Sequence, residues 1–430
     1  QVMFDQCKAL IIGLQKRGAV VGSSLNTAYL LERLSQTLER LETLMAIFVS
    51  NRYLPRRILL LTGCFARAAA ERHSISRLWK QSSGLMARSV TQNAGDHGEH
   101  YITRDKKEYW AMFYSAAGGG VLIALMALFK TYLGSIIDDK VWKGIAEGLN
   151  YGLGFMVIFM LHFTVATKQP AMTAARFAEA VEKTPQGKTV NMKLAQLLVD
   201  VFRSQSIAVL GNVLIAMGLA ALIAFGYQYK TGEPLMNADQ IAYQLHSIDP
   251  FAGTLWFAAI AGVWLFCSGI ISGYFDNRSN YLNMRMRLTQ HPLLKKLMSE
   301  KTRVKFANYM HENYGSLIGN LCFGMLLGIT GVVGYLTHLP LDIRHVAFSS
   351  ANVGYIAVSG HFTYSLLLQC IGFVLLIGLV NLIVSFSLTL WVALRSLNAE
   401  IDSWWPIWHE VCQIVKKRPL SLFLPVQLDK

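Results

Sequence analysis

Long runs without a charged residue constrain this chain most. Six runs of at least 20 residues contain no Lys, Arg, Asp or Glu, at 109–129, 148–167, 204–229, 250–275, 313–341 and 345–394. A membrane helix needs about 20 mostly apolar residues, and a charge at mid-bilayer costs roughly 2.5–3.5 kcal/mol on insertion scales. Only 15% of the chain is charged, against about 25% in soluble domains.

These runs predict an all-α, polytopic helical membrane protein with about six transmembrane helices and cytoplasmic helical segments. A soluble protein with six such buried core helices is the alternative that we reject. The expected spans are about 109–132, 147–167, 204–227, 253–275, 316–337 and 364–394.

The basic residues predict the orientation of the spans. The segments outside the expected spans contain 16, 2, 6, 1, 8, 1 and 5 Lys and Arg residues in chain order. Cytoplasmic loops carry an excess of Lys and Arg. We therefore expect a bacterial inner (cytoplasmic) membrane protein with both termini in the cytoplasm. The same pattern accounts for most of the net charge of +14. We expect these basic residues to contact anionic lipid headgroups, and we do not expect a nucleic-acid partner.

The expected organisation has four parts. Residues 1–92 form a cytoplasmic helical region, 93–108 a linker, and 109–394 the transmembrane domain with cytoplasmic helical loops 168–203 and 277–315; residues 395–430 form a cytoplasmic segment. The chain begins with Gln1 rather than Met, so we expect its start to lie further upstream. A heptad-like row of apolar residues from Leu31 to Phe48 predicts a helix that packs within the chain or forms a homodimer seam.

Several segments resemble a bacterial family catalogued as site-specific recombinases and sometimes called Gcr-like. The matching stretches are His162-Phe163-Thr164, Ala166 to Ala174, Gly273 to Asn277 and Leu339 to Val346. The resemblance runs from about Leu30 onward. It implies a membrane-embedded protein of Gram-negative bacteria, and the family name implies DNA recombination.

The residues themselves argue against recombinase chemistry. None of the 11 histidines is followed by Arg three positions later, as the active site of a tyrosine recombinase usually requires. The 26 Asp and Glu residues are scattered, so they do not predict a metal-dependent strand-transfer site. The chain contains no His-Glu-x-x-His zinc motif and no Walker-type loop. We expect no catalytic residue, no bound metal and no cofactor, and whether the protein is an enzyme stays open, leaning toward not.

Two sets of polar residues are candidate sites. Lys168 and Gln169 precede Pro170, which interrupts a helix, and Asp276 and Arg278 follow the fourth span. We expect these four residues to bind an anionic ligand or lipid headgroup at the cytoplasmic face. A helix stop, a cap and interfacial anchoring are the structural alternatives.

The second set concerns a proton-linked or polar path. His162 is the strongly titratable residue in the expected spans, whereas the other polar residues there suit helix-to-helix hydrogen bonds. The uncharged segment 345–363 is rich in Ser, Gly and His. We predict that residues 348–358 fold back as a short packed helix, with Ser349 and Asn352 facing a polar cavity. A surface loop without charge is the alternative.

The leading functional hypothesis is non-enzymatic transport, or translocation between leaflets, of a small solute or lipid. A membrane scaffold that docks partners through its N-terminal helices is one rival. A membrane-embedded enzyme acting on lipid headgroups is a second rival, and the catalogued recombinase is the third.

Overall fold

The computed structural model describes residues 2–21, 25–49, part of 55–66, 102–166 without 104, 181, 188–358, 362–396, and 401–425 without 402. All secondary structure of these residues is helical, so the predicted all-α class is confirmed. The chain divides into two compact units, one of residues 1–93 and 273–314 and the other of residues 94–272 and 315–430. Each is described by itself.

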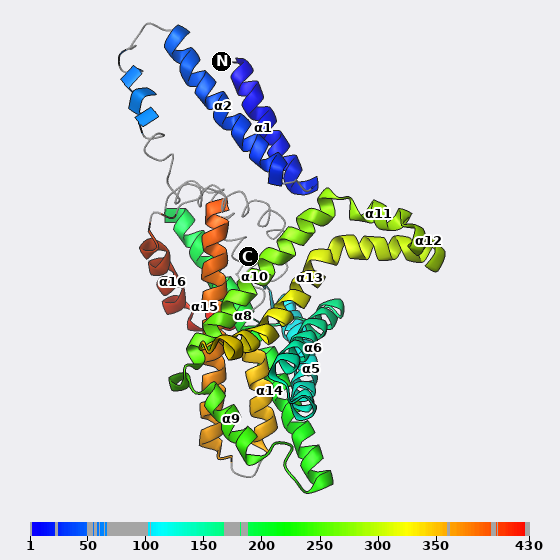
Figure 1. Ribbon diagram of the computed structural model, residues 1–430. Helices are drawn as coiled ribbons and strands as arrows, with labels where there is room; N and C mark the ends of the chain where they lie inside the picture. Colours follow the sequence, from blue (N-terminus) through cyan, green and yellow to red (C-terminus); the bar gives the residue numbers. More distant parts are fainter. Residues whose placement is uncertain are drawn as a thin grey trace. The chain divides into compact units, whose positions relative to one another are not determined.

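The first unit contains an antiparallel helix pair at the N-terminus. Helix α1 (Val2–Val21) and helix α2 (Leu25–Val49) lie side by side (Figure 1). Lys8 donates a hydrogen bond to the Glu42 carboxylate, and this bond raises the pKa of Lys8. The row from Leu31 to Phe48 lies on α2, as predicted, and three of its members, Leu34, Leu41 and Met45, are exposed. The homodimer seam stays a prediction.

The rest of this unit comes from the loop between two long helices. It contains the end of α10 (Thr254–Tyr281), the short helices α11 (Met284–Gln290) and α12 (Pro292–Leu297), and the start of α13 (Glu300–Thr337). The Ser279 hydroxyl lies 3.1 Å from His311 Nδ1 and thereby joins α10 to α13.

The second unit contains residues 254–272 of α10, residues 315–337 of α13 and the other helices (Figure 1). They are α5 (Lys106–Ile136), α6 (Lys140–Met160), α8 (Lys188–Thr231), α9 (Ala238–Ile248), the 3-10 turn η2 (Pro250–Ala252), α14 (Val346–Ala357), α15 (Tyr364–Ser396), α16 (Trp405–Lys417) and the 3-10 turn η3 (Pro419–Leu422).

Five of the described helices, α5, α8, α10, α13 and α15, are long and apolar enough to cross a membrane. The sixth expected span corresponds to α6, which is not among these five because Lys143, Glu147 and several polar residues occupy its first half. The expected end of this span at residue 167 is wrong. Helix α6 ends at Met160, and the chain turns at His162, whose φ is +57°.

The reason for this early end is a hydrogen-bonded clamp built by Asn212 of α8. Its side-chain amide donates to the carbonyl oxygens of Ala116 in α5 and Thr164 in the segment after α6. Its side-chain oxygen accepts the backbone N–H of Ala166 at 2.7 Å. Asn212 is fully buried, and these bonds satisfy backbone groups that the non-helical segment leaves unpaired.

Asn381 of α15 builds the same clamp in a later part of the chain. Its amide donates to the carbonyl oxygen of Ala258 in α10 at 2.7 Å and to that of Arg344, after α13, at 3.0 Å. Its oxygen accepts the backbone N–H of Val346 at 3.2 Å. In the first clamp, α8 binds α5 and the segment that follows α6. In the second clamp, α15 binds α10 and the segment that follows α13 in the same way.

The packing around the two clamps is also alike. Gly120 stands four positions after Ala116, and Gly262 stands four positions after Ala258. A Cβ at Gly120 would lie 2.9 Å from the Asn212 carbonyl oxygen, and a Cβ at Gly262 would lie 3.1 Å from that of Asn381. Only glycine allows both close approaches. Helices α5, α6 and α8 therefore form one half, and α10, α13 and α15 form an equivalent half.

The second helices of the two halves, α6 and α13, run in opposite directions. They pack through small residues, with the successive close pairs Gly152–Gly324, Gly148–Gly328 and Gly144–Val332. The residue number rises along one helix while it falls along the other, so the two halves are inverted with respect to each other. Arg344 follows Thr164 by 180 positions, and Gly328 follows Gly148 by the same 180. Equivalent residues therefore meet where α6 and α13 cross.

Helix α14 fills a groove between α8 and α15. It is the short packed helix that the uncharged segment predicts, and ten of its twelve residues are buried. Val353 of α14 packs with Val213 of α8 and with Cys370 and Val374 of α15. Figure 1 shows α14 running beside α15.

Candidate functional site

A cluster of aromatic rings surrounds His345 where the two halves meet. Phe155 comes from α6, Phe323 from α13 and Phe348 from α14. The His345 ring centroid lies 5.8 Å from that of Phe323 and 6.1 Å from that of Phe348, and the Phe155 and Phe323 centroids are 5.0 Å apart. His345 is only 1% exposed. An imidazole is thus held among aromatic rings contributed by both halves.

A half-buried ion pair adjoins this aromatic cluster. Lys130 Nζ of α5 lies 3.4 Å from a Glu147 carboxylate oxygen of α6 and 5.6 Å from the centre of the Tyr151 ring. The Tyr151 ring lies 4.5 Å from that of Phe348, which connects the ion pair to the cluster around His345. Ionisable groups among membrane helices are costly and commonly mark substrate or proton pathways. The junction of the halves is therefore the candidate functional site.

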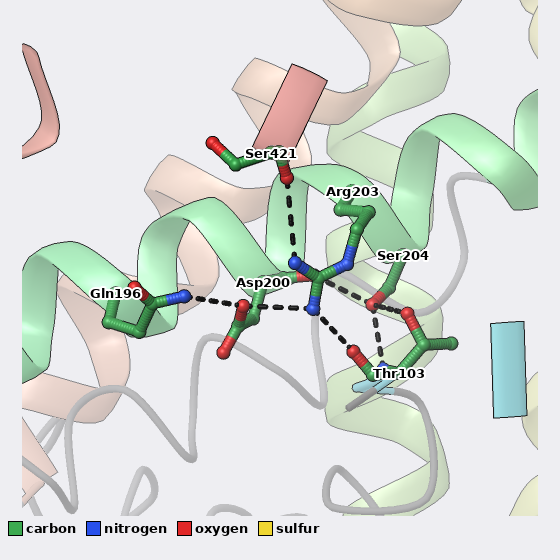
Figure 2. A network of polar contacts seen from close by, with 6 residues as sticks. All are labelled: Thr103, Gln196, Asp200, Arg203, Ser204 and Ser421. Carbon is green, nitrogen blue, oxygen red and sulfur yellow. Dashed lines mark hydrogen bonds and ion pairs between the residues drawn. The ribbon is translucent and has the colours of Figure 1, made fainter. Parts of the chain in front are cut away.

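A second polar centre surrounds Arg203 of α8 (Figure 2). One guanidinium nitrogen donates to the Thr103 carbonyl oxygen at 2.6 Å and to Asp200 Oδ1 at 2.9 Å. The other donates to the Ser421 carbonyl oxygen at 3.5 Å, and Ser204 Oγ accepts the backbone N–H of Thr103 at 2.8 Å. These bonds join the chain before α5, the first half of α8 and the C-terminal turn η3. The centre is an anchor between three segments.

The predicted headgroup site lies only partly within the described residues. Lys168 and Gln169 lie outside them. Asp276 and Arg278 lie near the end of α10, with Asp276 half-buried and Arg278 exposed. The meeting of these four residues at an anionic ligand therefore stays a prediction.

The residues of the predicted polar path lie in two different elements. His162 is exposed, and its carbonyl oxygen accepts the Ser115 hydroxyl at 3.0 Å. Ser349 is buried and Asn352 is half-buried, both on α14. Among the residues that the structure describes, no group of three His, Cys, Asp or Glu side chains is placed to hold a metal ion. The polar cavity and the proton-linked role stay predictions.

Sequence reasoning missed the ion pair and the environment of His345. Glu147 stands at the edge of a charge-free run, and Lys130 lies at the end of the first expected span. The opposite charges of Glu147 and Lys130 at the edges of two neighbouring expected spans are the sequence signal that could have predicted this ion pair. The rings around His345 come from distant segments, so no local pattern indicates them.

These features define an all-α membrane protein built from two inverted three-helix halves. The family model described as "Site-specific recombinase" matches residues 1–425. The chain belongs to this family. No curated protein and no solved structure shows a significant match.

Proposed function

We propose that this protein transports a small solute or a lipid across the membrane by rearranging its two inverted halves. The observation that carries the proposal is the pair of equivalent clamps, Asn212 and Asn381, in halves that run in opposite directions. Inverted repeats are the architecture of many secondary transporters. In such proteins one half moves against the other and exposes a central site alternately to the two sides.

The site between the halves has the chemistry that this function needs. The Lys130–Glu147 pair and His345 provide ionisable groups where α5, α6, α13 and α14 meet. Irregular backbone at membrane depth is tolerated where it is buried in protein or lines a wet cavity. The clamped segments around Thr164 and Arg344 are of this kind, and each can change its path without breaking a helix.

Distance measurements between the halves test the rearrangement. Spin labels at Leu125 of α5 and Leu375 of α15 would report on opposite halves, because both side chains are partly exposed. We expect two distance populations in the reconstituted protein, measured by double electron–electron resonance. A label pair within one half, at Leu125 and Leu214, is the control and should give one population. A single unchanged distance between the halves in every lipid and pH condition would contradict the proposal.

A membrane-scaffold role is the second candidate function. The observation that favours it is the exposed row Leu34, Leu41 and Met45 on α2. Such a row suits a partner helix or a second copy of the chain. Replacing Leu34 and Leu41 by Gln should release a partner without changing the distances between the halves, which separates this role from transport.

The family name suggests DNA recombination as a further activity. We assign no recombinase chemistry to this chain, because the site where the two halves meet consists of a half-buried ion pair, His345 and aromatic rings. Activity toward DNA is the subject of a prediction below.

A further inference from the structure

An apolar pocket opens between α8, α15 and α16. Its volume is about 770 Å³, within the range of small-molecule sites. Its walls are formed by sixteen residues, which include Val201, Leu382, Phe386, Ser387, Trp391 and Trp408. Ser387 alone among these residues carries an aliphatic hydroxyl, and none is charged. The pocket therefore suits a hydrocarbon ligand.

The inverted repeat identifies what this pocket corresponds to. Asn381 follows Asn212 by 169 positions, and the same step takes Val213 to Leu382 and Val201 to Cys370. Val213 and Cys370 share a hydrophobic cluster with Val346 and Val353 of α14, whereas Leu382 and Val201 line the pocket. The pocket is thus the counterpart, through the inverted repeat, of the groove between α8 and α15 that α14 fills.

The surroundings of the pocket indicate the ligand. Two of its walls belong to α8 and α15, which are long and apolar enough to cross a membrane. Three tryptophans, Trp391, Trp404 and Trp408, line it, and Trp side chains concentrate where hydrocarbon meets headgroups. The Arg395 guanidinium lies 4.4 Å from the centre of the Trp391 ring, where it can pair with a phosphate.

Helix α16 supplies the cover of this pocket. Ile407 and Val411 pack against Leu194 and Val199 of α8 and against Leu390 of α15. Lys416 and Lys417 occupy its last turn and are exposed. An amphipathic helix with a basic end lies in the plane of an anionic membrane surface.

From these observations we propose that the pocket between α8, α15 and α16 binds an acyl chain of an anionic phospholipid. The acyl chain occupies the position that corresponds, through the inverted repeat, to that of α14. The lipid phosphate pairs with Arg395. This inference names a bound lipid and holds whether or not the protein transports anything.

Photo-crosslinking in the purified full-length protein tests the proposal. The photoreactive amino acid p-benzoylphenylalanine is introduced at position 386, in the pocket, or at position 368, which is exposed on the same helix. The protein is reconstituted in phosphatidylcholine and phosphatidylglycerol vesicles, extracted in detergent, washed and irradiated. Intact-mass analysis should find a lipid adduct at 386, at least fivefold above that at 368.

Two outcomes would overturn the inference. Equal lipid adducts at both positions would mean ordinary bilayer contact. A crosslink from position 386 to a peptide of the chain, such as 167–187, would mean that the protein itself occupies the pocket. Both outcomes leave the distance measurement between the halves unaffected.

Two substitutions sharpen the test. Leu382→Trp fills the pocket and should abolish the lipid adduct at 386, whereas Leu368→Trp should not; an unchanged adduct in Leu382→Trp would overturn the site. Arg395→Gln should reduce the excess of phosphatidylglycerol over phosphatidylcholine among the adducts severalfold. An unchanged ratio would overturn the role of Arg395 in binding the phosphate. Melting temperatures of all variants confirm that they fold.

Discussion

Gly148 of α6 and Gly328 of α13 face each other, and each occupies the same position in its half. The two sites differ in tolerance. A Cβ at Gly148 would lie 3.4 Å from the Cα of Met325 and 3.5 Å from that of Gly328, which is ordinary contact. A Cβ at Gly328 would collide with the backbone of Gly148. The space for an added side-chain atom is therefore smaller at Gly328 of α13 than at Gly148 of α6.

Substitution at Gly328 should therefore destabilise the protein more than substitution at Gly148. We expect Gly328→Ala to cost about 1–3 kcal/mol through overpacking and Gly148→Ala to cost less. Gly331 on α13 has no atom within 4 Å of an added Cβ, so Gly331→Ala is the matched control and should be neutral or slightly stabilising. Thermal unfolding in detergent measures all three. Equal losses for Gly328→Ala and Gly331→Ala would show that the crossing does not depend on close approach.

The two clamps should respond alike to substitution. Asn212→Ala and Asn381→Ala each leave buried backbone groups without partners, at a cost of roughly 1–3 kcal/mol per group. Asn150, which donates to the Met126 carbonyl oxygen at 2.9 Å, offers a control that loses one bond. Melting temperatures should fall by similar amounts in the two clamp variants and by less in Asn150→Ala. A large loss for only one clamp would contradict their equivalence.

The Arg203 centre should be important for stability. Arg203→Ala removes the guanidinium that donates to Asp200 and to the carbonyl oxygens of Thr103 and Ser421, and breaking a buried pair costs about 3–5 kcal/mol. Arg203→Lys keeps the charge but not the several directed bonds, so it should rescue only in part. Arg285→Ala, at an exposed residue of α11, should change the melting temperature little. Full stability of Arg203→Ala would contradict the anchoring role.

Labelling of single cysteines should reveal the orientation. With the native cysteines replaced by Ser, Asp239→Cys on α9 should react with an impermeant maleimide added outside the cell. Arg285→Cys between α10 and α13 should react only after the membrane is permeabilised. The reverse pattern would overturn the predicted topology.

The purified protein should not cleave DNA at specific sequences. A basic chain binds DNA at low salt, and this binding should fall steeply as salt rises. The protein is incubated with supercoiled plasmid and with DNA that flanks the genes of this family. Sequencing of any new DNA ends then measures cleavage. Site-specific cleavage at physiological salt would restore the activity that the family name suggests.

The spans could be predicted from the sequence because charge is a local signal. Charge-free runs located α5, α8, α10, α13 and α15, and the uncharged stretch after Arg344 predicted the packed helix α14. The end of α6 could not be predicted, because it depends on Asn212, a residue far along the chain.

The repeat is hidden in the sequence for a physical reason. Equivalent residues are 142 positions apart for Ala116 and Ala258, but 180 apart for Gly148 and Gly328. This difference arises mainly from two features of the second half: α13 begins much further before Gly328 than α6 begins before Gly148, and the connection between α10 and α13 holds the additional helices α11 and α12. With a shift that changes along the chain and few identical residues, only the repeated contacts reveal the equivalence. The candidate site depends on these contacts, so the sequence alone did not locate it.

The inversion of the two halves follows from simple counting. Helix α6 is the counterpart of α13, so we expect it to cross the bilayer as α13 does; each half then has three crossings, an odd number, and the chain leaves a half on the opposite side of the bilayer from where it entered. A second copy joined directly behind the first must then insert upside down. Tandem duplication of one short gene would produce this architecture in a single step, without any additional crossing to reverse the second copy.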